Sequence, residues 1–213
     1  MDKNILPIFV EELNDSQIDY AILDGSNMLD SIMLGKNTMS IAVKIDQYKE
    51  FSLIARKYAR HVIHPCSKSY GWLYLYGLPE IERWRIKIKD DLFIDVYLML
   101  SCRGLQKCTL VPLDKALQEY LWNNRVFDTH FRCWFPDKNL KFIYLMTILV
   151  FNENHEYENL QGQLALLAEI IDYEIVKSML DKVFFAYTDT LICFARNKDF
   201  NQIRDRYIAF VDY

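Results

Sequence analysis

The chain has 213 residues, of which 52% are hydrophobic, and this content supports one packed domain or one domain with a helical extension. Its formal net charge of -4 at pH 7 excludes a protein that binds nucleic acid through bulk positive charge. Any surface that binds phosphate must therefore be a local patch.

Secretory and membrane classes have little support in the sequence. The first residues lack the basic region and the long apolar run of a signal peptide, and Pro7 interrupts them. The longest apolar stretch, residues 142–151, is too short to span a bilayer. Five scattered cysteines without a CxxC pair indicate reduced thiols rather than disulfides or a zinc site. We therefore expect a cytoplasmic protein without a membrane span.

The first half of the chain alternates helical and strand patterns. Apolar spacing and turn residues predict the following elements in order: helix 5–13, strand 18–24, a helix from Ser26 to Gly35, strand 40–45, helix 47–60, strand 61–65, a hairpin of 70–78 with 82–89, and strand 92–100. This order predicts an α/β protein of the α+β type, with a mixed sheet and helices packed on it.

The second half is predicted to be mainly helical. Pro112 is expected to open a helix, residues 126–135 to form a short strand or hairpin, and Pro136 to precede a strongly apolar helix that reaches about residue 152. Three more helices are predicted at residues 158–181, 183–197 and 200–211. We therefore expect an α/β domain over residues 1–110 and a C-terminal helical bundle over residues 111–213, packed on it as one body.

Two short motifs in the first half carry the functional signal. The strand at 18–24 ends in Gly25 and Ser26 and leads directly into a helix, and the apolar strand at 92–100 carries a single carboxylate, Asp95. Residues 18–100 resemble the nucleotidyltransferase superfamily that includes the DNA polymerase beta-like palm. The resemblance implies a palm fold, a glycine turn that approaches a triphosphate, and two magnesium ions held by three carboxylates.

The family's metal pattern requires two carboxylates at positions i and i+2 of one strand, because such residues point to the same face. They bridge two magnesium ions about 4 Å apart, which stabilise the attacking and leaving oxygens. In this chain those positions fall on Ser40 and Ala42, whereas Asp95 matches the third carboxylate. Asp24, directly before Gly25, is the second candidate metal ligand. The resemblance therefore implies that magnesium binds weakly or not at all.

A row of cations completes the candidate nucleotide site. Arg83, Arg85 and Lys87 recur at every second position, and the same spacing reaches Lys89, so one face of this strand could hold a triphosphate or a phosphorylated sugar with Gly25 and Ser26. The alternative is a solvated outer face on an edge strand. Asp95 itself is either a relic of the metal site or one half of a structural ion pair with Arg85 or Lys87.

Three functions remain open at this point. The first is a nucleotidyltransferase-like pseudoenzyme that binds a nucleotide or phosphorylated small molecule, or acts as a scaffold. The second is an active magnesium-dependent transferase of a nucleotide onto a small molecule, sugar or protein hydroxyl. The third is a toxin–antitoxin or polysaccharide-pathway interaction partner that reuses the palm, with the aromatic helices between residues 140 and 195 as a surface for a protein partner or for a homo-oligomer.

Overall fold

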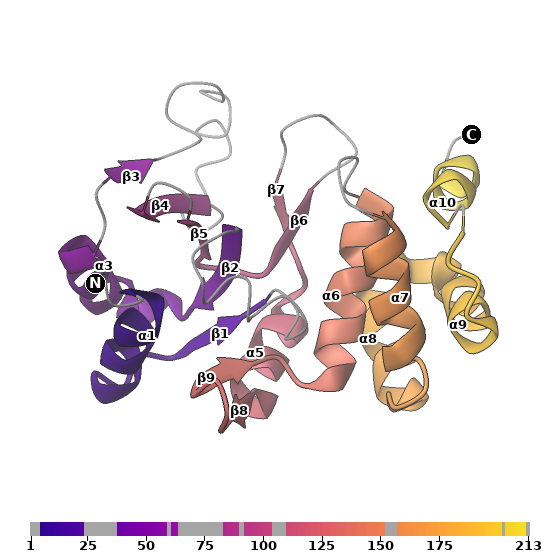
Figure 1. Cartoon of the computed structure of the whole chain (residues 1–213). Helices are drawn as coiled ribbons and strands as arrows, with labels where there is room; N and C mark the ends of the chain where they lie inside the picture. The colour runs from indigo at the N-terminus through magenta and orange to yellow at the C-terminus, as the bar shows by residue number, and fades with distance from the viewer. Residues whose placement is uncertain are drawn as a thin grey trace. The chain divides into compact units, whose positions relative to one another are not determined.

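The computed structural model describes most of the chain and divides it into two units (Figure 1). The first unit comprises residues 1–101 and 125–135, and the second comprises residues 102–124 and 136–213. The described ranges are residues 5–23, 38–58, 61–63, 83–89, 92–103, 110–151, 157–201 and 203–211.

The first unit is built on a mixed sheet, as predicted. Its strand order is β1 (Tyr20–Ile22), β2 (Thr38–Val43), β5 (Leu92–Tyr97), β4 (Arg83–Lys89) and β3 (His61–Ile63). Strands β2 and β5 run parallel, whereas the pairs β1–β2, β4–β5 and β3–β4 are antiparallel. This arrangement confirms the α+β class.

Two helices, α1 (Ile5–Asp15) and α3 (Tyr48–Tyr58), pack on one face of this sheet. A short 3-10 turn, η2 (Ile45–Gln47), precedes α3. Alternate strand residues point into the same core, which contains these side chains: Leu6, Phe9, Val10, Leu13, Tyr20, Ile22, Met39, Ile41, Val43, Phe51, Ile54, Ala55, Ile94 and Val96. The residues between them on β1, β2 and β5 therefore point to the opposite face.

A hairpin from much later in the sequence belongs to the first unit. Strands β8 (Val126–Asp128) and β9 (Cys133–Phe135) pair antiparallel, and β9 contacts β1. Cys133 and Phe135 enter the same core as Tyr20. The prediction of a strand or hairpin at residues 126–135 is thus confirmed in its hairpin form, and the division of the chain interleaves in sequence rather than falling once near residue 110.

The second unit is mainly helical. Strand β6 (Ser101–Arg103), which begins at the last residue of the first unit's long segment, pairs with β7 (Leu110–Pro112). The helical elements are α5 (Lys115–Asn124), α6 (Lys138–Phe151), α7 (Tyr157–Leu167), α8 (Tyr173–Phe184), the 3-10 turn η5 (Phe185–Tyr187), α9 (Thr188–Asn197) and α10 (Ile203–Val211). None of the helices in the described ranges is both long and apolar enough to cross a bilayer.

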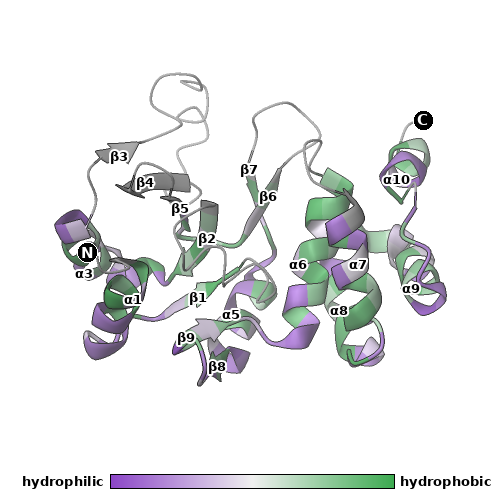
Figure 2. Ribbon diagram, in the orientation of Figure 1, coloured by the Kyte–Doolittle hydropathy of each residue, from purple (hydrophilic) through white to green (hydrophobic). Residues whose placement is uncertain are grey.

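Helix α6 forms the centre of this unit and contacts α7, α8 and α10. Most of its side chains are buried, and Figure 2 shows that it is hydrophobic over much of its length. At its end Phe151 stacks on Phe184 with ring centroids 5.3 Å apart, and Tyr207 meets both rings edge-on at 5.5 Å. Aromatic contacts of this kind add to the stability gained from area burial.

The structure corrects three predicted boundaries in the second half. Pro112 ends β7, and α5 begins only at Lys115. The carboxylate of Asp114 accepts a hydrogen bond of 2.8 Å from the backbone N–H of Ala116. The predicted helix 158–181 is two helices, because Asp172 caps α8 by accepting the N–H groups of Glu174 and Ile175. Helix α8 then passes the predicted break at Asp181 and ends at Phe184.

Candidate functional site

Asp95 lies in the middle of β5, and only 4% of it is exposed. Its neighbours Ile94 and Val96 enter the core under α1 and α3. Because successive side chains of a strand alternate, Asp95 points to the opposite face of the sheet. A carboxylate so deeply buried is costly unless polar groups surround it, so this face of the sheet must contain polar partners.

Ser40 is the direct neighbour of Asp95. The parallel register of β2 and β5 pairs the Cα of Ser40 with that of Asp95, and the Cα of Ala42 with that of Tyr97. Ser40 is half-buried and Ala42 is 1% exposed. The two positions predicted for metal carboxylates therefore lie on the same face as Asp95, and the position next to Asp95 offers a hydroxyl instead of a carboxylate.

The start of the predicted glycine turn is hydrogen-bonded to Ser40. The backbone N–H of Leu23, directly after β1, donates to the carbonyl of Ser40 at 2.9 Å. Asp24, Gly25 and Ser26 follow Leu23 in sequence but lie outside the described residues, as does the helix predicted from Ser26 to Gly35. Their assignment to metal and nucleotide binding stays a prediction.

Strand β4 brings the cationic positions to the other side of Asp95. The antiparallel register pairs Arg83 with Tyr97, Arg85 with Asp95 and Lys87 with Phe93. Since β4 lies between β5 and β3, it is an inner strand of the sheet. The alternative prediction, a solvated face on an edge strand, therefore does not apply to it. The register shifts between Lys87 and Lys89, so Lys89 falls out of the predicted period-two row. The segment 70–78, the predicted hairpin partner of β4, lies outside the described residues.

Among the described residues, the oxygen donors beside Asp95 are too few for a pair of magnesium ions, and Asp24, the other predicted ligand, lies outside the described residues. Asp95 supplies one carboxylate, Ser40 one neutral hydroxyl and Ala42 no ligand, whereas two divalent ions need several anionic oxygens. Within the described ranges, no three His, Cys, Asp or Glu side chains gather as metal ligands would.

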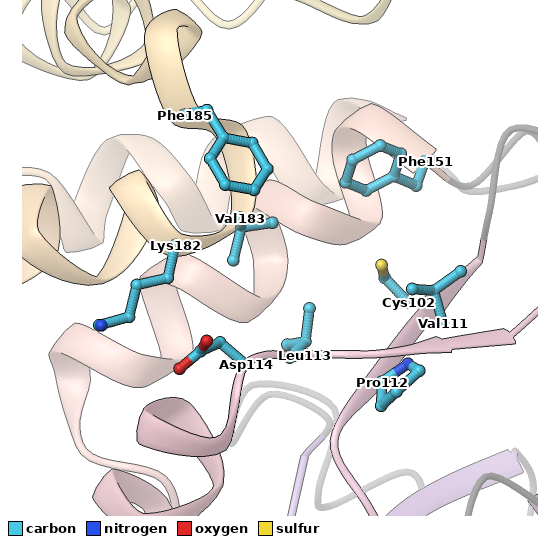
Figure 3. Close-up of a pocket in the computed structure, with 9 residues that line it drawn as sticks. All are labelled: Cys102, Val111, Pro112, Leu113, Asp114, Phe151, Lys182, Val183 and Phe185. Carbon is cyan, nitrogen blue, oxygen red and sulfur yellow. The ribbon is translucent and has the colours of Figure 1, made fainter. Parts of the chain in front are cut away.

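A cavity lies entirely in the second unit, and no motif in the sequence predicts it. Figure 3 shows this cavity, which is lined by Cys102, Val111, Pro112, Leu113, Asp114, Phe151, Lys182, Val183 and Phe185. These residues come from four separate segments and share no motif. Phe185, one of the lining residues, has an unusual backbone conformation. This conformation cannot be recognised from the sequence.

No family model matches this chain, and searches of curated proteins and of solved structures give no match either.

Proposed function

We propose that the first unit is a nucleotidyltransferase-like palm that binds a nucleotide or a phosphorylated small molecule and has lost two-metal chemistry. The observation that carries the proposal is the row of Cα partners Arg85, Asp95 and Ser40 across β4, β5 and β2. A palm requires its third carboxylate strand to run beside the strand of the metal pair, and β5 does lie beside β2 in this way.

Chemistry at the row supports binding rather than catalysis. Phosphoryl transfer depends on metal ions that neutralise charge at the reacting phosphate. With Ser40 and Ala42 in place of carboxylates, that charge is not available. Arginine and lysine bind phosphate oxygens directly, and arginine does so with two parallel hydrogen bonds. We assign this role to β4, with the Ser40 hydroxyl as an additional donor and Asp95 as the group that balances the cations.

Thermal stabilisation by nucleotides tests the proposal. ATP, GTP, CTP, UTP and a nucleotide sugar are each added with EDTA, and separately with magnesium or manganese. We expect at least one of them to raise the unfolding temperature equally in EDTA and in metal. Arg85→Gln should reduce that shift, whereas Arg56→Gln, which removes an exposed cation of α3, should leave it unchanged.

Two results would contradict this function. Stabilisation that requires metal and disappears in Asp95→Asn would indicate a working magnesium-dependent transferase. Absence of any response to the five ligands would favour the third reading, in which the palm is an interaction surface.

A further inference from the structure

We propose that the cavity of the second unit binds a small zwitterion with an apolar body, of the class of an aromatic amino acid. This inference is independent of the nucleotide site, because all nine lining residues belong to the second unit. It depends on three features of the cavity: its apolar wall, the two opposite charges at one end, and the strained backbone at its rim.

The wall of the cavity suits a hydrocarbon group. Val111, Phe151 and Val183 contribute apolar surface, and the cavity volume is about 240 Å³. Ligand pockets for drug-sized molecules occupy roughly 300–1,000 Å³, so this cavity fits a molecule of one ring and a few further atoms. Burial raises the pKa of Cys102 to about 11, so its thiol stays protonated at neutral pH and acts as a small apolar group, not as a nucleophile.

The charged groups of the cavity lie at one end. In Figure 3 the Lys182 ammonium and the Asp114 carboxylate lie on the same side of the cavity, opposite Cys102, Val111 and Phe151. Asp114 uses one carboxylate oxygen to cap α5. Lys182 is exposed, and within the described part of the chain no ion pair of its ammonium is found, so this ammonium can reach a ligand in the cavity. One free cation beside one acid matches a ligand that carries a carboxylate and an ammonium group.

The rim of the cavity contains the strained residue. Phe185 has φ 49° and ψ -125°, a conformation that a residue with a Cβ adopts only under constraint. Phe185 caps the C-terminus of α8, where its backbone N–H donates to the carbonyl of Asp181, and its side chain is 74% exposed. Strained residues of this kind concentrate at ligand clamps, where the surrounding structure holds them. Closure of the Phe185 ring over a bound apolar group would bury surface that is exposed in the free protein.

Fluorine NMR titration of the full chain provides the test, with para-fluoro-L-phenylalanine as the probe. Two matched probes each lack one charge: para-fluorophenylpropionate has no ammonium group, and para-fluorophenethylamine has no carboxylate. We expect saturable binding of the amino acid and affinity about three- to five-fold lower for each single-charge probe, because a solvent-accessible ion pair contributes up to about 1 kcal/mol.

Two charge variants should change the affinities of the three probes in different ways. Lys182→Gln should weaken binding of the amino acid and of the propionate but not of the amine. Asp114→Asn, which keeps a good helix cap, should weaken binding of the amino acid and of the amine but not of the propionate. Lys138→Gln, which removes an exposed lysine outside the cavity, is the matched control and should change none of the three affinities.

A rim variant tests the role of Phe185. Phe185→Gly should raise the unfolding temperature of the free protein, since glycine adopts this conformation without strain, and it should also weaken amino-acid binding. Absence of saturable binding, equal binding of all three probes, or losses of the same size in Lys138→Gln would each overturn the inference. These failures would leave the nucleotide site untouched, since that site is tested with different ligands in the other unit.

Discussion

One guanidinium, that of Arg125, connects the β8–β9 hairpin to the first strand of the sheet. It forms an ion pair with Asp19, donates to the carbonyl of Tyr20 at 3.2 Å and lies over the ring of Trp134 at 4.5 Å. Its side chain is 17% exposed. Lys44 also pairs with Asp19, at 3.2 Å, but is 39% exposed. The two cations share one carboxylate and differ in burial and in geometry, so their contributions to stability should differ.

At the scale of single residues, we predict that Arg125→Lys lowers the free energy of unfolding by about 1–2 kcal/mol, because lysine keeps the charge but loses the fork geometry and the stacking on Trp134. Lys44→Met should cost about 0–1 kcal/mol, as expected for an exposed pair. Urea unfolding of both variants provides the comparison. An equal loss of unfolding free energy in the two variants would show that the shape of the Arg125 guanidinium adds nothing to its positive charge.

At the scale of elements, the parallel register of β2 and β5 predicts that side chains at positions 40 and 95 can share a ligand. Ser40→Asp places a second carboxylate beside Asp95, and like charges in one site oppose each other. We expect the variant to be about 1–2 kcal/mol less stable than the natural chain in EDTA. Manganese or magnesium should then restore much of this stability, because two adjacent carboxylates form a hard-oxygen site.

Ser40→Asn is the matched control, since it has the same shape as aspartate and no charge. Its unfolding temperature should not depend on metal. If Ser40→Asp were equally insensitive to metal, Ser40 and Asp95 would not converge on a common ligand position, and the assignment of β2 as the metal strand would fail.

The elements that could be predicted from the sequence are those with a local signal. Helices α1 and α3 and strands β1, β2 and β5 have clear apolar patterns, and they occur close to the predicted positions. The break between α7 and α8 was missed, because apolar spacing continues across it. It depends on the Asp172 cap and on the bond from the Asp172 N–H to the Asn139 side chain, 33 residues earlier in sequence.

Some features of the candidate sites depend on contacts between residues far apart in the sequence, and these features could not be predicted from it. The hairpin at residues 126–135 was predicted locally, but its place in the first unit depends on the contact of Arg125 with Asp19, 106 residues apart. The candidate row at Asp95 was expected from the resemblance. That Arg85 lies opposite Asp95, on an inner strand, follows only from the register of the sheet. The cavity residues have no periodic or motif signal in the sequence at all.

At the scale of the whole molecule, each unit contains a thiol whose pKa is raised by burial: Cys133 is buried and Cys102 is half-buried. Burial raises the pKa of Cys102 to about 11 in the second unit and that of Cys133 to about 12 in the first. The hydrogen bond to Glu12 raises the pKa of Tyr58 to about 12. In each case the folded protein holds the proton more tightly than the unfolded chain does.

A group with a raised folded pKa stabilises the fold fully below its unfolded pKa, and this contribution is lost as the pH rises toward the folded value. For the thiols the ordinary value is 9.0, so the loss begins near that pH and continues toward 11 for Cys102 and 12 for Cys133. Stability should therefore fall steeply on the alkaline side, whereas these groups contribute no slope near neutral pH. The contribution of Cys102 is on the order of 2 kcal/mol.

Urea unfolding midpoints between about pH 7 and about pH 10.5 measure this loss. Cys102→Val and Cys133→Val replace each thiol by an apolar group that does not titrate. Each variant should lose less stability over this range than the natural chain, even if its midpoint at neutral pH is lower because of imperfect packing. If both variants lost as much as the natural chain, the alkaline slope would come from the tyrosines, and folding would not raise the pKa of Cys102 and Cys133.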